Sequence, residues 1–295
     1  ACREMVHESA RRMHWPPHRS GLLSQRRIFL YPMRTRRNET LMKKIFASVA
    51  TVVALCATFN VQARSLEAIQ KAGSITMGSE GQYAPFNFFK GKQLTGYEID
   101  VAEAVAKKMN LKYEWKAVGF DALLTGLAQD RWDLVIASHG ITPEREKAVT
   151  FTVPHYCSGG QIVSLSPSIK TAADLAGKVV AVQTGTSYLE HVKKVPGVKE
   201  VKNFPTDEAA RAALGSKRVD AWVTDRFVAK EMLSKTPKAG FQTGDMLFIE
   251  QVAAAVSKGN TPLADAYNKA FKELVADGTI GKISQKYFQE DVTCK

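Results

Sequence analysis

The chain has 295 residues, enough for one large domain or two smaller ones. It carries 41 Lys and Arg residues against 29 Asp and Glu residues, a formal net charge of +12. Residues 1–63 hold 11 of the basic and 3 of the acidic residues, so the remainder has a net charge of only +4. No cluster of basic and aromatic residues remains there, and nucleic-acid binding is not expected. The sequence also lacks CxxC and HExxH motifs, so no metal site or other cofactor is expected.

The N-terminal 63 residues have the features of an export signal. Residues 1–41 show neither a helical nor a strand period, and we interpret them as a non-native or unstructured upstream extension. Met42-Lys43-Lys44 then begins a positively charged segment, and the apolar run 45–59 follows it. Val61-Gln62-Ala63 resembles a signal-peptidase site, and the apolar run is too short for a transmembrane helix. A cleavable signal peptide over 42–63 and a periplasmic protein are therefore expected.

The cysteines bear on anchoring and on disulfide formation. Cys56 would suit a lipoprotein, but Leu55 stands where a lipidation motif needs a small residue, so lipidation is the less favoured alternative. Cys157 and Cys294 lie beyond the cleavage site. An even pair in an oxidising compartment either forms a disulfide or remains as two unrelated thiols, and we expect the disulfide.

From residue 64 onward, apolar strands alternate with amphipathic helices. The first expected elements are a strand at 74–78, a helix at 96–109, a strand at 111–115, a helix at 120–127 and a strand at 133–137. Parallel strands with crossover helices explain this order most economically. Ligands of such sheets bind beyond the carboxyl ends of the strands, which is where the loops after these strands would lie.

The segment 136–145 combines a strand end with a helix start. Thr142 is an N-cap candidate and Pro143 occupies the first helical position, so free N–H groups would face the strand end and form an anion site. Arg145, one turn into the helix, could bind a carboxylate with both arms of its guanidinium. The alternative is a solvated arginine that pairs with Glu144 or Glu146.

The same plan begins again in the second half of the chain. The expected elements are a strand at 179–182, a helix from about 188, a strand at 199–204, a helix capped by Thr206, a strand at 219–223, a strand at 251–256 and two final helices. The polar turn 183–187 is a second anion site of the same type. Residues 161–250 therefore predict a second, smaller α/β lobe.

Six motifs follow one another in a fixed order and spacing. They are Tyr83–Phe86 (YAPF), Gly96–Met109 (GYEIDVAEAVAKKM), Phe120–Leu124 (FDALL), Ile141–Arg145 (ITPER), Asp174–Thr186 (DLAGKVVAVQTGT) and Asp277–Thr279 (DGT). Together they resemble the family-3 bacterial extracellular solute-binding proteins, the polar amino-acid receptors of ABC importers. The resemblance extends from about Leu66 to Val292.

This resemblance implies a two-lobed α/β fold of the periplasmic-binding-protein type II, with two hinge strands and a ligand cleft between the lobes. Lobe 1 would comprise 64–155 plus 253–295, and lobe 2 would comprise 156–252 with the crossovers. Hinge closure around the ligand would follow. The implied function is that of a monomeric, non-catalytic receptor, which captures a polar amino acid and delivers it to an ABC permease in the inner membrane.

The resemblance also implies how the ligand is held. A free amino acid presents one carboxylate and one ammonium group. Arg145, with the N–H groups around Gly140 and Thr142, would bind the carboxylate, and Thr186 would add a donor from the other lobe. Asp225 would bind the ammonium, although an ordinary turn or cap aspartate is the alternative. The full expected set is Glu80, Tyr83, Phe120, Ser138, His139, Gly140, Thr142, Arg145, Thr186 and Asp225.

Side-chain selectivity depends on the remaining members of this set. Tyr83 and Phe120 would wall the pocket, and Glu80 stands where receptors for cationic amino acids carry an acid. Arg, Lys, ornithine or His is therefore favoured over Gln, cystine or another polar amino acid. Gly140 departs from relatives that often have Ser or Thr, so a hydroxyl contact is missing there. His139 is also unusual and faces either the cleft or the lobe interior.

Two other functional classes stay open. The fold resembles that of cyclohexadienyl dehydratases, in which a pocket carboxylic acid protonates a leaving hydroxyl, and Glu80 would be the candidate acid. The presence of Asp225 for an ammonium group favours an amino acid over a keto acid. A sensory role would require a soluble co-receptor, because no transmembrane or signalling segment follows Lys295 in this sequence.

Overall fold

The structure, a computed structural model, describes residues 63–294, which all fall within one unit of the chain. The expected extension over 1–41 and nearly all of the expected signal peptide over 42–63 lie outside the described residues. Among residues 63–294, no helix is both long and apolar enough to cross a membrane.

Helices and strands alternate along most of the described chain. The elements are α2 (Leu66–Ala72), β1 (Ser74–Ser79), β2 (Gln82–Tyr83), β3 (Asn87–Lys90), β4 (Gln93–Thr95), α3 (Tyr97–Lys108), β5 (Lys112–Ala117), α4 (Phe120–Ala128), β6 (Leu134–Val135), α5 (Pro143–Ala148), β7 (Val149–Ser164), η1 (Ala173–Leu175), β8 (Val179–Gln183), α6 (Ser187–Lys193), β9 (Glu200–Phe204), α7 (Asp207–Gly215), β10 (Ala221–Asp225), α8 (Arg226–Lys235), η2 (Pro237–Ala239), β11 (Gln242–Ser257), α9 (Thr261–Ala276) and α10 (Thr279–Phe288).

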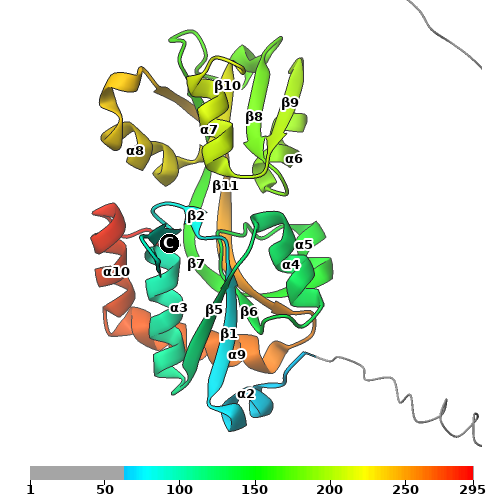
Figure 1. Ribbon diagram of the computed structural model, residues 1–295, viewed down its shortest axis with the longest axis vertical. Coiled ribbons are helices and arrows are strands. Elements are labelled where there is room, and N and C mark those ends of the chain that lie inside the picture. The colour runs from blue at the N-terminus through cyan, green and yellow to red at the C-terminus, as the bar shows by residue number, and fades with distance from the viewer. Residues whose placement is uncertain (1–62, 295) are drawn as a thin grey trace, which may run out of the picture. The chain divides into compact units, whose positions relative to one another are not determined.

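Eight strands form one mixed sheet in the order β5-β1-β6-β11-β7-β10-β8-β9. The pairs β1–β5 and β1–β6 are parallel at one end, and β8–β9 and β8–β10 are parallel at the other. The long strands β7 and β11 pair antiparallel from Ser164–Gln242 to Val149–Ser257 and connect the two groups (Figure 1). The predicted two-lobed α/β fold with two linking strands is confirmed, while the lobe boundaries at 155/156 and 252/253 stay a prediction.

Local sequence signals explain where the helices near the cleft begin. The hydroxyls of Thr142, Thr186 and Thr206 each accept a hydrogen bond from the backbone N–H three residues later. Each threonine thereby satisfies one of the free donors at a helix start. Gly96 precedes α3 at φ 129°, and a Cβ there would lie 2.2 Å from the Phe86 carbonyl oxygen, so only glycine fits.

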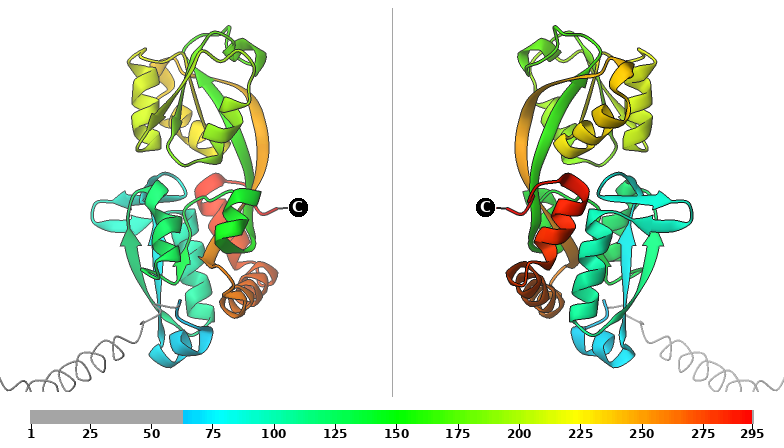
Figure 2. Two further views of the ribbon diagram at one scale, coloured as in Figure 1. Left: turned by 90° about the vertical axis from the view of Figure 1, so that its right-hand side faces the viewer. Right: turned by 90° about the vertical axis from the view of Figure 1, so that its left-hand side faces the viewer.

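Helices α3, α9 and α10 pack against one another on the first lobe (Figure 2). A disulfide joins Cys157 of β7 to Cys294, the pair expected from the sequence, with the two Cα atoms 4.9 Å apart. The Cys157 N–H also donates to the Val292 carbonyl at 3.0 Å. The segment after α10 is therefore fastened to one of the two linking strands.

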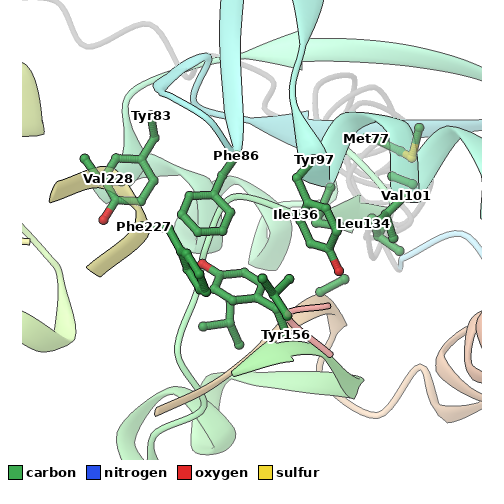
Figure 3. Close-up of a cluster of buried hydrophobic side chains, with 14 of the residues drawn as sticks. Met77, Tyr83, Phe86, Tyr97, Val101, Leu134, Ile136, Tyr156, Phe227 and Val228 are labelled. Atoms are coloured by element: carbon green, nitrogen blue, oxygen red, sulfur yellow. The ribbon is translucent and has the colours of Figure 1, made fainter. Parts of the chain in front are cut away.

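An aromatic cluster crosses from one lobe to the other beside the cleft. Figure 3 shows Tyr83 and Phe86 of the first lobe gathered with Phe227 of α8 and Tyr156 of β7. The Phe86 ring stacks on Tyr156 with centroids 4.6 Å apart and meets the Phe227 ring at 6.3 Å. Because these rings are almost fully buried, separation of the lobes would expose a large apolar area.

Candidate ligand-binding site

A small pocket lies between the lobes at the carboxyl ends of β1, β6 and β8. Its lining consists of Glu80, Tyr83, Phe120, Ser138, Arg145, Gln183, Thr186, Ser187 and Tyr188. Six of the ten residues expected from the sequence are therefore brought together here. The side chains leave a cavity of only 10 Å³, which is about the space of one water molecule. A molecule larger than water could enter only if the lobes moved apart.

Arg145 links the two lobes at one wall of this pocket. Its Nη1 donates to the Gly140 carbonyl at 2.7 Å, and its Nη2 donates to the Gly185 carbonyl of the other lobe at 2.9 Å. The guanidinium also lies over the Phe120 ring, 5.8 Å from the centroid. These contacts differ from the alternative of a solvated arginine paired with Glu144 or Glu146.

Asp225 is the last residue of β10 and the N-cap of α8, and it is fully buried. Its Oδ1 accepts from the Phe227 N–H at 2.7 Å, while its buried Oδ2 has no hydrogen-bond partner among the described residues. Burial raises the pKa of this carboxyl group to about 7. Asp225 does not itself line the pocket, but its N–H donates to the Tyr83 hydroxyl at 3.3 Å.

Tyr83 and Glu80 both reach from the first lobe to the second. The Tyr83 hydroxyl lies 3.2 Å from that of Tyr188. Glu80 is only 4% exposed, and its Oε1 accepts from Gln183 Nε2 at 2.6 Å. Burial raises the pKa of Glu80 to about 7, with nearby carboxylates such as Asp207 adding to the rise. The pocket therefore contains a carboxyl group that a cationic partner would help to ionise.

Ser138 lines the pocket, but its polar groups are already engaged. Its N–H and its hydroxyl donate to the two carboxylate oxygens of Glu98, at 2.7 and 3.0 Å. The same fully buried carboxylate accepts from Asn87 Nδ2 at 2.8 Å and contacts His155 Nε2 at 2.9 Å. Glu98 thus fixes the loop after β6. Sequence reasoning missed this role, although Glu98 lies in the GYEID motif.

The other three expected residues do not line this pocket. His139 is 2% exposed and stacks on Phe120 with ring centroids 4.3 Å apart, and its orientation toward the cleft or the lobe interior stays a prediction. Burial lowers the pKa of His139 well below its usual value. Thr142 lines an adjoining groove, and Gly140 contributes its carbonyl to Arg145.

Four residues near the cleft were not predicted. Gln183 and Ser187 are the ends of the turn that was interpreted as a second anion site and Tyr188 follows it, so a signal for their location existed. Glu250 of β11 had no such signal. Among residues 63–294, no group of three or more His, Cys, Asp or Glu side chains is arranged to hold a metal ion.

The raised pKa values of three buried carboxyl groups predict that the stability of the folded protein falls with increasing pH. Glu80, Asp207 and Asp225 each have a folded pKa of about 7, well above the ordinary values of 4.5 for Glu and 3.8 for Asp. At any pH between the ordinary pKa and the folded-state pKa, the folded protein binds more protons than the unfolded chain. The stability from these groups is therefore fully present below the ordinary pKa and is lost as pH rises through the folded-state pKa. The lowered pKa of His139 has the opposite effect, but it is one group against three, so thermal unfolding should show a higher Tm at about pH 5 than at about pH 8.

Asp225→Asn should raise the unfolding free energy at about pH 8 by on the order of 2 kcal/mol and flatten this pH dependence. Asp265→Asn, on an exposed position of α9, is the matched control and should change neither quantity. A Tm that rises from about pH 5 to pH 8 in both proteins would contradict the prediction.

Comparisons with known proteins agree with this architecture. A model of the bacterial extracellular solute-binding proteins, family 3, matches residues 75–290. The L-cystine-binding protein TcyJ of Escherichia coli is 36% identical over 234 residues, covering 77% of this chain and 87% of that protein. An ancestral arginine-binding protein bound to arginine matches with a TM-score of 0.71 at 40% identity, covering 73% of this chain and 98% of that one.

A further structural match concerns the possibility of catalysis. The ancestral amino acid-binding protein AncCDT-1, a precursor of cyclohexadienyl dehydratase, matches with a TM-score of 0.70 at 31% identity and covers 76% of this chain and 99% of that chain. The fold of this chain is therefore shared with binding proteins and with an ancestor of an enzyme.

Proposed function

Because the chain belongs to the bacterial extracellular solute-binding proteins of family 3, we propose that it captures a polar amino acid in the periplasm and delivers it to an ABC permease. In this proposal the signal peptide over 42–63 is cleaved, and the mature protein, which begins at Arg64, acts as a monomer. The observation that carries the amino-acid assignment is the presence of one basic and one acidic side chain, Arg145 and Asp225, at the cleft. Arg145 bridges the lobes, and Asp225 behind Tyr83 has a buried oxygen without a partner among the described residues.

Each end of a free amino acid then has a partner. The guanidinium of Arg145 binds the carboxylate as a bidentate donor, and Asp225 binds the ammonium group once Tyr83 has moved with its lobe. The N–H groups near Gly140, Thr142 and Thr186 add donors. Since Arg145 bonds to both lobes and the present cavity holds about one water molecule, ligand entry and capture require opening and closing of the hinge strands β7 and β11.

The Glu80 carboxyl group favours a ligand with a cationic side chain. The carboxyl group is buried, lies beside Tyr83 and Phe120 in the pocket lining, and has a raised pKa because burial disfavours its charge. A ligand guanidinium or ammonium group would stabilise that charge. We therefore favour Arg, Lys, ornithine or His, followed by cystine, Gln or another polar amino acid.

Calorimetric and thermal-shift measurements on the purified protein test this function. At about 100 times its Kd, a ligand specific for the folded state adds roughly 2.7 kcal/mol of stability and should raise Tm by several degrees. We expect this shift with one class among the proteinogenic amino acids, ornithine, citrulline and cystine. Glu80→Gln should weaken a cationic ligand much more than a neutral one. No shift with any amino acid would overturn the proposal and direct the search to keto acids and a dehydratase assay.

A further inference from the structure

Glu250 is a buried carboxyl group that the proposed binding scheme does not yet use. It lies in the linking strand β11, in register with Ser158 of β7, and is 9% exposed. A charged side chain at such a position costs free energy unless it has partners or a function. Its contacts therefore indicate what it is placed to do.

The carboxyl group of Glu250 is inserted between the two loops that flank Arg145. Its Oε2 accepts from the Ser187 hydroxyl of the second lobe at 2.6 Å. On the first-lobe side, a Cβ added at Gly140 would lie only 2.0 Å from the same oxygen. Oε1 is buried and has no hydrogen-bond partner among the described residues. Glu250 thus fills the space of a side chain at position 140 and keeps one oxygen free.

The surroundings connect Glu250 to the ligand site. A groove of 840 Å³ is lined by Arg145, Thr186, Ser187 and Glu250, and the first three of these residues also line the pocket between the lobes. The two carbonyls that hold the Arg145 guanidinium belong to Gly140 and Gly185, on the same two loops. A carboxylate bound by Arg145 would therefore meet Glu250 at close range.

We propose that the Glu250 carboxyl group is a further contact for the carboxylate of the bound amino acid, in the space that a side chain at position 140 would fill. This inference rests on the proposed function and adds proton uptake to it. Two carboxylates at hydrogen-bond distance cannot both be ionised without strong repulsion, so they share one proton. The proton comes from solvent, resides on Glu250 and forms the hydrogen bond to the ligand oxygen. As the O–H bond of Glu250 forms, the bond that held this proton in hydronium or a buffer acid breaks, and no other covalent bond changes.

The surroundings of Glu250 determine how readily its carboxyl group binds this proton. Burial raises the pKa of Glu250, while the hydrogen bond from Ser187 and the positive charge of Arg145 act in the opposite direction. The other titratable groups that face it are His191 and Tyr188 of α6 and Asp225 of β10. Asp225 must be ionised to hold an ammonium group. Protonation of Asp225 therefore weakens ligand binding, whereas protonation of Glu250 strengthens it.

Titration calorimetry from about pH 5 to about pH 9, in pairs of buffers with different ionisation enthalpies, tests the inference on the purified protein. The probe is whichever of arginine, lysine, ornithine, histidine, cystine and glutamine gives the largest thermal shift. Above the pH at which Glu250 ionises in the free protein, affinity should fall about tenfold per pH unit, with uptake of about one proton. Glu250→Gln should match the wild type at low pH, remove the proton uptake and bind more tightly than the wild type at high pH.

Three further variants identify the source of any pH dependence. Glu190→Gln removes an exposed carboxylate that lines the same groove and should keep the wild-type profile. His191→Asn should keep the proton uptake, because the proposal places the proton on Glu250, and loss of a positive charge that faces Glu250 should move the profile to higher pH. Glu250→Ala, which removes the donor altogether, should bind more weakly than Glu250→Gln at low pH.

The outcomes separate this inference from the proposed function. Proton uptake that persists in Glu250→Gln, or a wild-type affinity that does not fall with pH, would overturn the role of Glu250 while leaving an amino-acid receptor intact. Failure of the wild type and all variants to bind any amino acid, with normal thermal unfolding, would overturn the proposed function and this inference with it.

Discussion

Arg145→Ala should weaken amino-acid binding by about 150- to 4000-fold, since loss of one partner of a buried charge pair costs roughly 3–5 kcal/mol. Two contributions combine in this expected loss. The ligand carboxylate loses its charged, forked donor, and the closed form loses the bonds from the guanidinium to Gly140 in one lobe and Gly185 in the other. Binding and closure would therefore weaken together, as measured by isothermal titration calorimetry.

Arg145→Lys provides a graded test of the same contact. Lysine keeps the positive charge but cannot reach two carbonyls and a carboxylate with a planar fork, so affinity should fall about tenfold or more. Arg218→Ala, which removes an exposed guanidinium from the second lobe, is the matched control and should leave affinity unchanged. Wild-type affinity in Arg145→Ala would place the carboxylate site elsewhere.

The fold was predictable wherever its signals are local in the sequence. Thr142 and Thr206 were predicted to cap helices, and both hydroxyls accept the expected hydrogen bonds in the structure. These caps need only a suitable residue and the three that follow it. Hydrophobic periodicity likewise located most strands and helices, because the period of each element repeats within a few residues.

The candidate site was predictable only in part, because its contacts join distant segments. Glu98 and Ser138 are 40 residues apart, and Glu250 and Ser187 are 63 apart. On sequence alone, Glu98 is an acidic residue in the first turn of a helix, where it would suit the helix dipole and face solvent. Nothing local shows that its side chain turns inward to a loop of another element.

The role of Tyr83 was underestimated for the same reason. It was expected to wall the side-chain pocket, yet its hydroxyl also meets Tyr188 and the Asp225 N–H of the other lobe. Such contacts depend on how far one lobe approaches the other, and no periodicity within either segment encodes that distance. The residues that couple the lobes are therefore the ones that sequence reasoning identifies least well.

Glu98→Ala should lower the free energy of unfolding by about 3–5 kcal/mol, the range expected when a buried, fully bonded charged group is removed. The carboxylate has no exposed surface and accepts from Asn87 and twice from Ser138, in addition to its contact with His155. Its loss leaves these donors buried without an acceptor. At about 2–4 °C per kcal/mol, Tm in a thermal melt should fall by roughly 10 °C.

The same substitution should also impair ligand binding, because Glu98 holds the N–H and hydroxyl of Ser138 and thereby the loop that leads to Gly140. Glu103→Ala is the matched control on the same helix α3. Its carboxylate is 25% exposed, so its removal should cost about 1 kcal/mol and spare affinity. Equal stability losses in the two variants would show that the Glu98 network contributes no more than the partly exposed Glu103 carboxylate, and that another interaction fixes the loop after β6.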